Sequence, residues 1–253
     1  DEDGLQGIEL SPTFDEDGWL YVFYAPPLNT PPGDAPANGT PEQFEAFKGA
    51  NYVSRFQLDL ETATIDLDSE EVLLEIPTDR GRCCHVGGDL VFGENGDLFI
   101  STGDDTDPFS SNGYAPIDDR EGRSPAFDAR RSSANTNDLR GKILRIRPLA
   151  EAGDEPGPGS TYEIPEGNLF PPGTEGTRPE IFVMGLRNPF RIEYDPVTNA
   201  VLWGEYGPDA GSAGAQGPMG YVEWSMTTVP ENHGWPLCIA DNKPYPDWNF
   251  DTN

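Results

Sequence analysis

The sequence predicts an all-β protein, and three observations carry that prediction. Glycine (29 residues) and proline (26 residues) are spread between short apolar segments, which is typical of many strands joined by turns. Those segments are rich in β-branched and aromatic residues, which favour strands. A hairpin pattern also recurs along the chain. Helical periodicity is limited to one short candidate at Pro41–Phe47.

Each predicted strand is a short run of apolar, β-branched or aromatic residues between turn signals. In chain order they are Trp19–Tyr24, Tyr52–Leu58, Val72–Ile76, Leu90–Phe92, Leu98–Ser101, Ile143–Arg147, Ile181–Met184, Phe190–Tyr194 and Ala200–Trp203.

An internal repeat groups these strands into sheets. Leu10–Tyr21, Leu90–Phe99 and Ile192–Trp203 share an apolar strand, a turn with Asp, Asn or Gly, and a strand with an aromatic residue. Repeated antiparallel sheets with long loops between them indicate a β-propeller of four-stranded antiparallel blades. A β-sandwich with similar hairpins is the alternative. About three to four blades can be recognised, and a ring usually needs about four to eight. We therefore expect residues 1–253 to form part of a propeller domain.

The charge of the chain limits its partners and suggests its habitat. With 45 acidic and 16 basic residues, the net charge is −29. Repulsion excludes nucleic acid and anionic membranes as partners. At molar salt the Debye length falls to about 3 Å, which would relieve the self-repulsion of the chain. This predicts a protein from a halophilic organism, with an ordinary acidic secreted protein as the alternative. No apolar run is long enough for membrane insertion.

The three cysteines are an odd number, which suggests that a partner lies outside the chain or that a thiol is free. Cys83 and Cys84 are adjacent and leave three alternatives: a vicinal disulfide, pairing of one of them with another loop, or free thiols. Cys238 can pair with a cysteine beyond Asn253. A disulfide would favour an exported, extracellular protein. Together with the abrupt start at Asp1, the odd count leads us to expect a longer polypeptide.

Rare reactive residues are concentrated in one run, Arg82–Gly88. It holds His85, one of only two histidines, and is followed directly by the Asp89–Thr102 hairpin. With Gly87 and Gly88 beside it, the imidazole can project into a central channel as a general base. A structural histidine in a turn is the alternative.

Two later segments carry chemistry that fits a cofactor. At a strand entry, Arg187 and Asn188 place a guanidinium that can hold a planar anion bidentately, although a surface ion pair is the alternative. The segment Gly204–Asp209 combines carboxylates with the carbonyls of a Gly-Pro turn. Oxygen ligands of this kind suit calcium.

The order of six segments resembles a known family, the soluble pyrroloquinoline-quinone (PQQ)-dependent glucose/sorbosone dehydrogenases. The segments are GLQGIELSPTF (4–14), HVGGDLVFGENGDLFISTGD (85–104), NDLRGKILRI (137–146), GLRNPF (185–190), GEYGPD (204–209) and NHGWP (232–236). They span nearly the whole chain. The resemblance implies a propeller that is six-bladed in full, with PQQ over its central channel.

The resemblance also implies an activity: PQQ- and calcium-dependent oxidation of an aldose or related sugar, from the C1 hydroxyl to the lactone. His85 matches the catalytic base, and Arg187 and Asn188 match the residues beside PQQ. Gly207 and Pro208 match the residues whose carbonyls hold calcium.

The match also gives supporting positions and departures. Asp104 takes a supporting role. Glu2 stands where the family has a substrate-binding glutamine, which leaves the sugar open. The lysine and arginines of the family's later blades lie beyond this chain.

Two other functions remain as alternatives. A propeller can serve as a non-catalytic extracellular recognition module, since fold does not fix function. A calcium-dependent lactonase on a related propeller would need acidic ligands around the channel rather than an Arg-Asn pair. The sequence does not define the electron acceptor or the oligomeric state.

Overall fold

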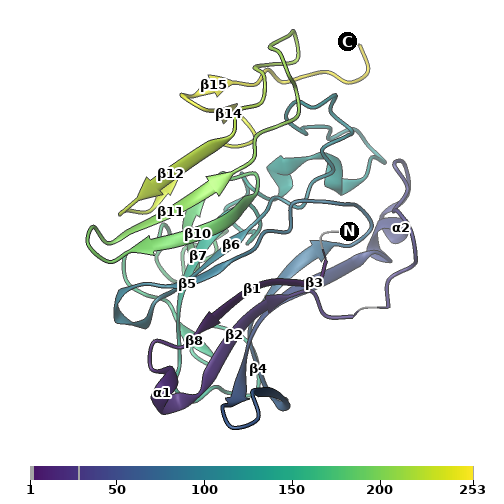
Figure 1. The fold of residues 1–253 in the computed structure, drawn as a ribbon. Helices are drawn as coiled ribbons and strands as arrows, with labels where there is room; N and C mark the ends of the chain where they lie inside the picture. The colour runs from purple at the N-terminus through teal and green to yellow at the C-terminus, as the bar shows by residue number, and fades with distance from the viewer. Residues whose placement is uncertain (1–2, 28, 253) are drawn as a thin grey trace.

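The protein is built almost entirely from antiparallel β-sheets, as predicted (Figure 1). The computed structural model describes residues 3–27 and 29–252. Three sheets stand in a row, and the loops that carry most of the motifs described above gather at one end of them. No helix in these two ranges is long and apolar enough to cross a membrane.

The first sheet has four antiparallel strands in sequential order. They are β1 (Leu5–Leu10), β2 (Trp19–Tyr24), β3 (Lys48–Asp59) and β4 (Thr64–Asp79). A short helix, α1 (Phe14–Asp17), lies within the first connection. The predicted helix at Pro41–Phe47 exists as α2 (Pro41–Glu45) and ends two residues earlier than expected. Pro41 begins it, where its missing N–H costs nothing.

The second sheet is built around the hairpin that follows His85. Its main strands are β5 (Leu90–Phe92), β6 (Leu98–Thr102), β7 (Lys142–Pro148) and β9 (Ile181–Met184). The two-residue β8 (Tyr162–Glu163) pairs with β7. At the far edge, β13 (Glu231–Asn232) runs parallel to β9. Short 3-10 turns lie at Glu94–Gly96, Pro125–Phe127 and Ala129–Arg131.

The third sheet has three antiparallel strands in the described part of the chain. They are β10 (Pro189–Asp195), β11 (Ala200–Glu205) and β12 (Glu223–Thr227). A small separate hairpin, β14 (Cys238–Ile239) with β15 (Lys243–Pro244), follows. In Figure 1 this hairpin lies above the third sheet, on the side of the loops.

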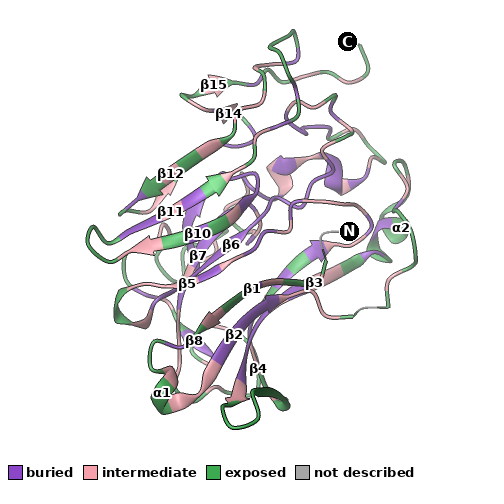
Figure 2. Cartoon of the chain, viewed as in Figure 1, coloured by how far each residue is buried: buried purple, intermediate pink, exposed green. Residues whose placement is uncertain are grey.

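The sheets pack face to face, and Figure 2 shows buried residues along the strands of all three. Phe23, Val53 and Leu73 of the first sheet form one core cluster with residues of the second. Phe99 of the second sheet joins Trp203 of the third in another cluster. Strand β6 is therefore buried on both faces, which explains its unbroken apolar run. Burying each large apolar side chain contributes about 1.5–3 kcal/mol.

All nine predicted strands are present, and several are longer than predicted. Strands β3 and β4 run for 12 and 16 residues, because their polar ends continue the ladder beyond the apolar centre. The turn of the first repeat contains α1 rather than a tight hairpin. Strands β1 and β12 were not predicted, because neither is a continuous apolar run; in β12 polar and apolar residues alternate, and Trp224 is 76% exposed. A row of antiparallel sheets fits a propeller, and the six-bladed ring stays a prediction.

Candidate active site

The predicted site residues lie in loops at one end of the second and third sheets. His85 lies in the connection from β4 to β5, and Asp104 follows β6. Arg187 and Asn188 connect β9 to β10. Direct contacts join these segments, because Asp104 N–H donates to the Arg187 carbonyl at 2.7 Å. The structure thus brings together residues that are far apart in the sequence.

His85 is buried, with 5% of its surface exposed. Its Nδ1 lies 2.8 Å from Asp104 Oδ1 and 3.4 Å from Thr106 Oγ1. A carboxylate only accepts hydrogen bonds, so Nδ1 carries the proton in this contact. The neutral imidazole then has its lone pair on Nε2. That tautomer is the one a general base needs.

Asp104 is fully buried and is surrounded by donors. Oδ1 also accepts from Thr106 N–H at 3.1 Å and from the Thr106 hydroxyl at 2.7 Å. Oδ2 accepts from Trp235 Nε1 at 2.8 Å. Burial alone would raise the pKa of Asp104, but the interaction with His85, the charge of Arg187 and the hydrogen bonds outweigh it and lower the pKa. Asp104 is thus held as a carboxylate that fixes His85.

Arg187 differs from the other arginines of the chain. It is 5% exposed, and its Nη1 donates to the Tyr206 carbonyl at 3.1 Å. No carboxylate of the described residues lies within ion-pair distance of its guanidinium. Except for the exposed Arg191, every other arginine has such a partner. Among the buried arginines of the described residues, only Arg187 has a guanidinium without a carboxylate partner, in a chain with a net charge of −29, which is consistent with an anionic ligand.

Asn188 links the histidine loop to the arginine segment. Its Oδ1 accepts a hydrogen bond from Gly87 N–H at 3.1 Å. Gly103 lies between the histidine loop and the arginine segment. A Cβ there would overlap the His85 carbonyl and lie 2.6 Å from Asn188 Oδ1. Only glycine allows this close approach.

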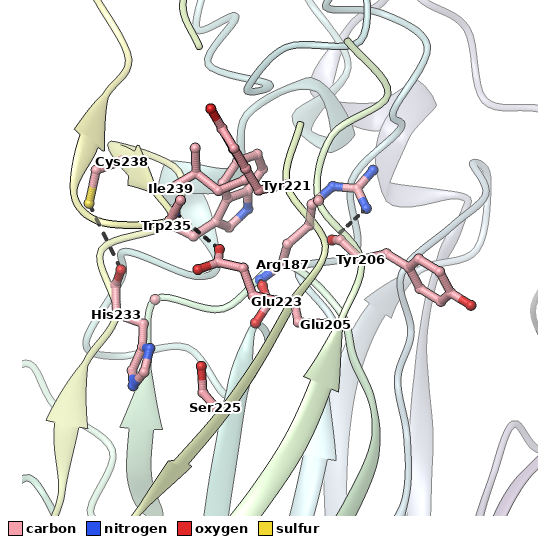
Figure 3. A pocket seen from close by; sticks show the side chains of 13 residues that line it. Arg187, Glu205, Tyr206, Tyr221, Glu223, Ser225, His233, Trp235, Cys238 and Ile239 are labelled. Carbon is pink, nitrogen blue, oxygen red and sulfur yellow. Dashed lines mark hydrogen bonds between the residues drawn. The ribbon is translucent and has the colours of Figure 1, made fainter. Parts of the chain in front are cut away.

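A small polar cavity of about 40 Å³ lies beside Arg187 (Figure 3). Glu205, Gly207 and Glu223 contribute to its lining. Glu205 also accepts a hydrogen bond from Arg187 N–H. Burial raises the pKa of Glu205 to about 8, the Arg187 N–H opposes that rise, and the charge of Glu223 adds to it. The cavity is thus rich in oxygen atoms and has room for an ion or a water molecule.

Gly207 and Pro208 differ in their surroundings. Gly207 lines the cavity, whereas the Pro208 carbonyl packs against Gly220, where a Cβ would overlap it. Across residues 3–27 and 29–252, no group of three or more His, Cys, Asp or Glu side chains could hold a metal. Calcium binding by the two carbonyls stays a prediction.

Tyr245 adds a polar atom to this region that was not expected from the sequence. Its side chain is buried, packs edge-on against Trp235 and has a hydroxyl with no hydrogen-bond partner in the described part of the chain. Burial raises the pKa of Tyr245, and the positive charge of Arg187 opposes that rise. A buried hydroxyl without a partner near a buried arginine is consistent with a polar ligand there.

The cysteines adopt one of the three alternatives considered above. Cys83 and Cys84 are joined by a disulfide immediately before His85, and Cys238 is a half-buried free thiol. Glu2, the candidate substrate residue, lies outside the described residues.

Several residues of the site were not singled out from the sequence. Trp235 and Glu205 lie inside the motifs NHGWP and GEYGPD, but nothing in these motifs indicates a contact with Asp104 or Arg187. Tyr245 belongs to no motif. Their roles depend on loop packing, which periodicity and spacing do not encode.

Rows of antiparallel sheets with a buried His–Asp pair and a buried arginine at their loop ends are consistent with a β-propeller. More specifically, the chain belongs to the glucose/sorbosone dehydrogenase family. The family model described as Glucose / Sorbosone dehydrogenase matches residues 1–247. The resemblance noted from the six motifs is confirmed.

Two curated relatives illustrate the range of this similarity. The aldose sugar dehydrogenase YliI of Escherichia coli is 29% identical over 154 residues, which are 61% of this chain and 29% of that protein. The human Hedgehog-interacting protein is 29% identical over 199 residues, 77% of this chain and 23% of that protein. The chain thus spans less than a third of either relative.

Solved structures share the fold. A putative oxidoreductase (glucose dehydrogenase) from Thermus thermophilus is 26% identical, with a TM-score of 0.60 over 97% of this chain and 56% of that one. The PQQ-bound aldose sugar dehydrogenase of Streptomyces coelicolor is 20% identical, with a TM-score of 0.57 over 96% of this chain and 53% of that one. The chain spans about half the length of these structures.

Proposed function

We propose that this protein takes part in PQQ- and calcium-dependent oxidation of an aldose or related sugar, from the C1 hydroxyl to the lactone. One observation carries the proposal: the guanidinium of the buried Arg187 has no carboxylate within ion-pair distance among the described residues, although nearly all other arginines have one. Its charge is therefore available for an anion. PQQ is a planar tricarboxylate, and the His85–Asp104 pair lies in the neighbouring segment.

The residues of the site fit PQQ in their chemistry. Arg187 offers a cation, and the buried Tyr245 hydroxyl lacks a partner within the described ranges. A ligand with carboxylate and quinone oxygens would satisfy both. When bound, PQQ would supply an acceptor for the hydride from C1, and calcium would polarise it as a Lewis acid.

Residues of this chain can accept the proton that the anomeric hydroxyl of the sugar loses. His85 Nε2 takes the proton of the anomeric hydroxyl as the hydride leaves C1, so the sugar loses two electrons and forms the lactone. Asp104 stabilises the imidazolium that results, because it is a carboxylate 2.8 Å from Nδ1. Arg187 stabilises negative charge that develops on the acceptor.

The Gly207 and Pro208 carbonyls would hold calcium. In support of this, Gly207 lines a cavity to which Glu205 and Glu223 also contribute, and oxygen ligands are what calcium prefers. A cation there would also offset the repulsion between the two carboxyl groups.

The test measures PQQ binding and turnover separately. The protein is equilibrated with calcium and PQQ in high salt, quinone binding is followed by its absorbance, and aldose oxidation by reduction of a dye acceptor. Arg187→Ala should weaken PQQ binding by roughly 10–100-fold, because a charge-assisted contact is lost. His85→Gln should abolish turnover and leave binding largely intact. Absence of both binding and turnover would refute the proposal.

A second candidate, a non-catalytic recognition module, is supported by the similarity to the human Hedgehog-interacting protein. An added carboxylate at Glu2 also differs from the enzyme pattern. If the Arg187→Ala and His85→Gln variants both still bind a protein ligand, and do so without sugar, the result would favour this function.

We also propose an exported location and a halophilic source. The Cys83–Cys84 disulfide supports export, and the charge of −29 supports the source.

A further inference from the structure

Lys142 at the start of β7 is a fully buried lysine, with 0% of its surface exposed. Its Nζ donates to three main-chain carbonyls: Ser132 at 2.8 Å, Ser133 at 3.0 Å and Arg140 at 2.8 Å. An ammonium group has three N–H donors, so the carbonyls use all of them. The Lys142 ammonium group therefore binds three main-chain carbonyls and holds them close together.

Two of these carbonyls belong to serines that reach the two halves of the site. The Ser132 hydroxyl donates to the Asp104 carbonyl at 2.7 Å. The Ser133 hydroxyl donates to the Leu186 carbonyl at 2.6 Å, and the Ser133 carbonyl accepts from Gly185 N–H at 3.2 Å. The Ser132–Ser133 turn thus bridges the segment that orients His85 and the segment that carries Arg187.

A buried ammonium is unfavourable unless its surroundings compensate for lost water. Burial lowers the pKa of Lys142 to about 7, the charges of Asp138 and Asp104 oppose this effect, and Arg140 adds to it. Methionine would fill a similar volume without that cost. The role of lysine is therefore in its donors rather than its bulk.

We propose that Lys142 is a positioning residue: by holding the Ser132–Ser133 turn, it fixes the Asp104–His85 segment relative to the Arg187 segment. This rests on the proposed function in one respect, since it takes these segments as the two halves of one site. Lys142 touches neither substrate nor cofactor and acts through the two serines.

The first experiment needs no quinone and measures amide hydrogen exchange at about pH 6, below the pKa of Lys142, where the ammonium is charged. In Lys142→Met, exchange should rise by roughly tenfold in residues 103–106 and 185–187, because each segment loses a fixed anchor. The first sheet should not change. Ser132→Ala should raise exchange only in 103–106, and Ser133→Ala only in 185–187. Lys48→Met, which removes an exposed lysine paired with Glu45, is the matched control.

The second experiment separates binding from turnover. Ser133→Ala should weaken PQQ affinity, Ser132→Ala should lower kcat with little change in affinity, and Lys142→Met should do both. A uniform rise of exchange over all sheets in Lys142→Met, or no rise in either segment, would overturn the proposal. If no variant or parent binds PQQ, the proposed function fails, and the exchange pattern still decides the role of Lys142.

Discussion

At the scale of single residues, the site depends on one buried carboxylate. Asp104 accepts hydrogen bonds from His85, Thr106 and Trp235 at once. Asparagine has the same shape but only one accepting oxygen, so it cannot satisfy donors on both sides. The consequence is measurable as stability as well as activity.

Asp104→Asn should lower the free energy of unfolding by about 2–4 kcal/mol at neutral pH, because a buried charged contact loses one partner. The pKa of Asp104 is lowered from 3.8 in the folded protein. The wild-type advantage is therefore complete above about pH 4 and disappears as pH falls through the folded pKa. Urea unfolding across pH checks this. Asp15→Asn, at an exposed carboxylate, should show no difference.

For the Tyr245 hydroxyl we expect the opposite effect: its removal should raise the free energy of unfolding. Because it has no partner in the described part of the chain, Tyr245→Phe should raise the free energy of unfolding by about 1 kcal/mol without ligand. Thermal unfolding measures this, and PQQ titration should show weaker binding. Tyr162→Phe is the control: it removes a buried 2.7 Å hydrogen bond to Glu180 and should destabilise. Loss of stability in Tyr245→Phe would mean that the hydroxyl is satisfied.

At the scale of elements, the site exists because the loop after β6 passes very close to its neighbours. Gly103 lies against the His85 carbonyl and Asn188. Its carbonyl accepts from Gly141 N–H, and the next N–H along the chain donates to the Arg187 carbonyl. Because the nearest obstructing atoms are main chain, a side chain at Gly103 cannot be accommodated by a rotamer change.

Gly103→Ala should therefore destabilise the protein by about 2 kcal/mol or more, and turnover should fall because His85 and Asn188 are displaced. Gly211→Ala is the matched control, since a Cβ at this exposed glycine meets nothing within 4 Å. It should be neutral or slightly stabilising. Urea unfolding compares the two. Equal stability of both variants would show that the loop adapts.

The strands and the site differ in how far they could be predicted from sequence. Strands β5 and β9 have the bounds that were predicted for them, because each is an apolar run closed by turn residues. Strand β12 was missed because its sequence, Glu-Trp-Ser-Met-Thr, alternates polar with apolar residues and is not a continuous apolar run. His85, Arg187 and Asn188 were found through motifs. Lys142 and Tyr245 were not assigned roles, since these depend on carbonyls and rings brought near by loops distant in sequence.

At the scale of the whole molecule, two charge effects compete. Ion pairs such as those of Arg140 with Asp105 and Asp138 are buried and only weakly screened by salt. The 45 acidic residues outnumber the 16 basic residues. The excess carboxylates repel one another over the surface. Salt should therefore remove more repulsion than attraction.

The free energy of unfolding at neutral pH should accordingly rise by about 2 kcal/mol or more between roughly 0.1 and 2 M KCl, as the Debye length falls from about 10 Å to below about 3 Å. Urea titrations at fixed salt measure it. A variant that neutralises four exposed, unpaired carboxylates (Glu61→Gln, Asp68→Asn, Glu155→Gln, Glu175→Gln) should start more stable and gain less from salt. If both proteins gain equally, salt acts through apolar burial rather than charge, and the halophilic interpretation loses its support. If the parent is less stable in salt, its ion pairs outweigh its repulsion.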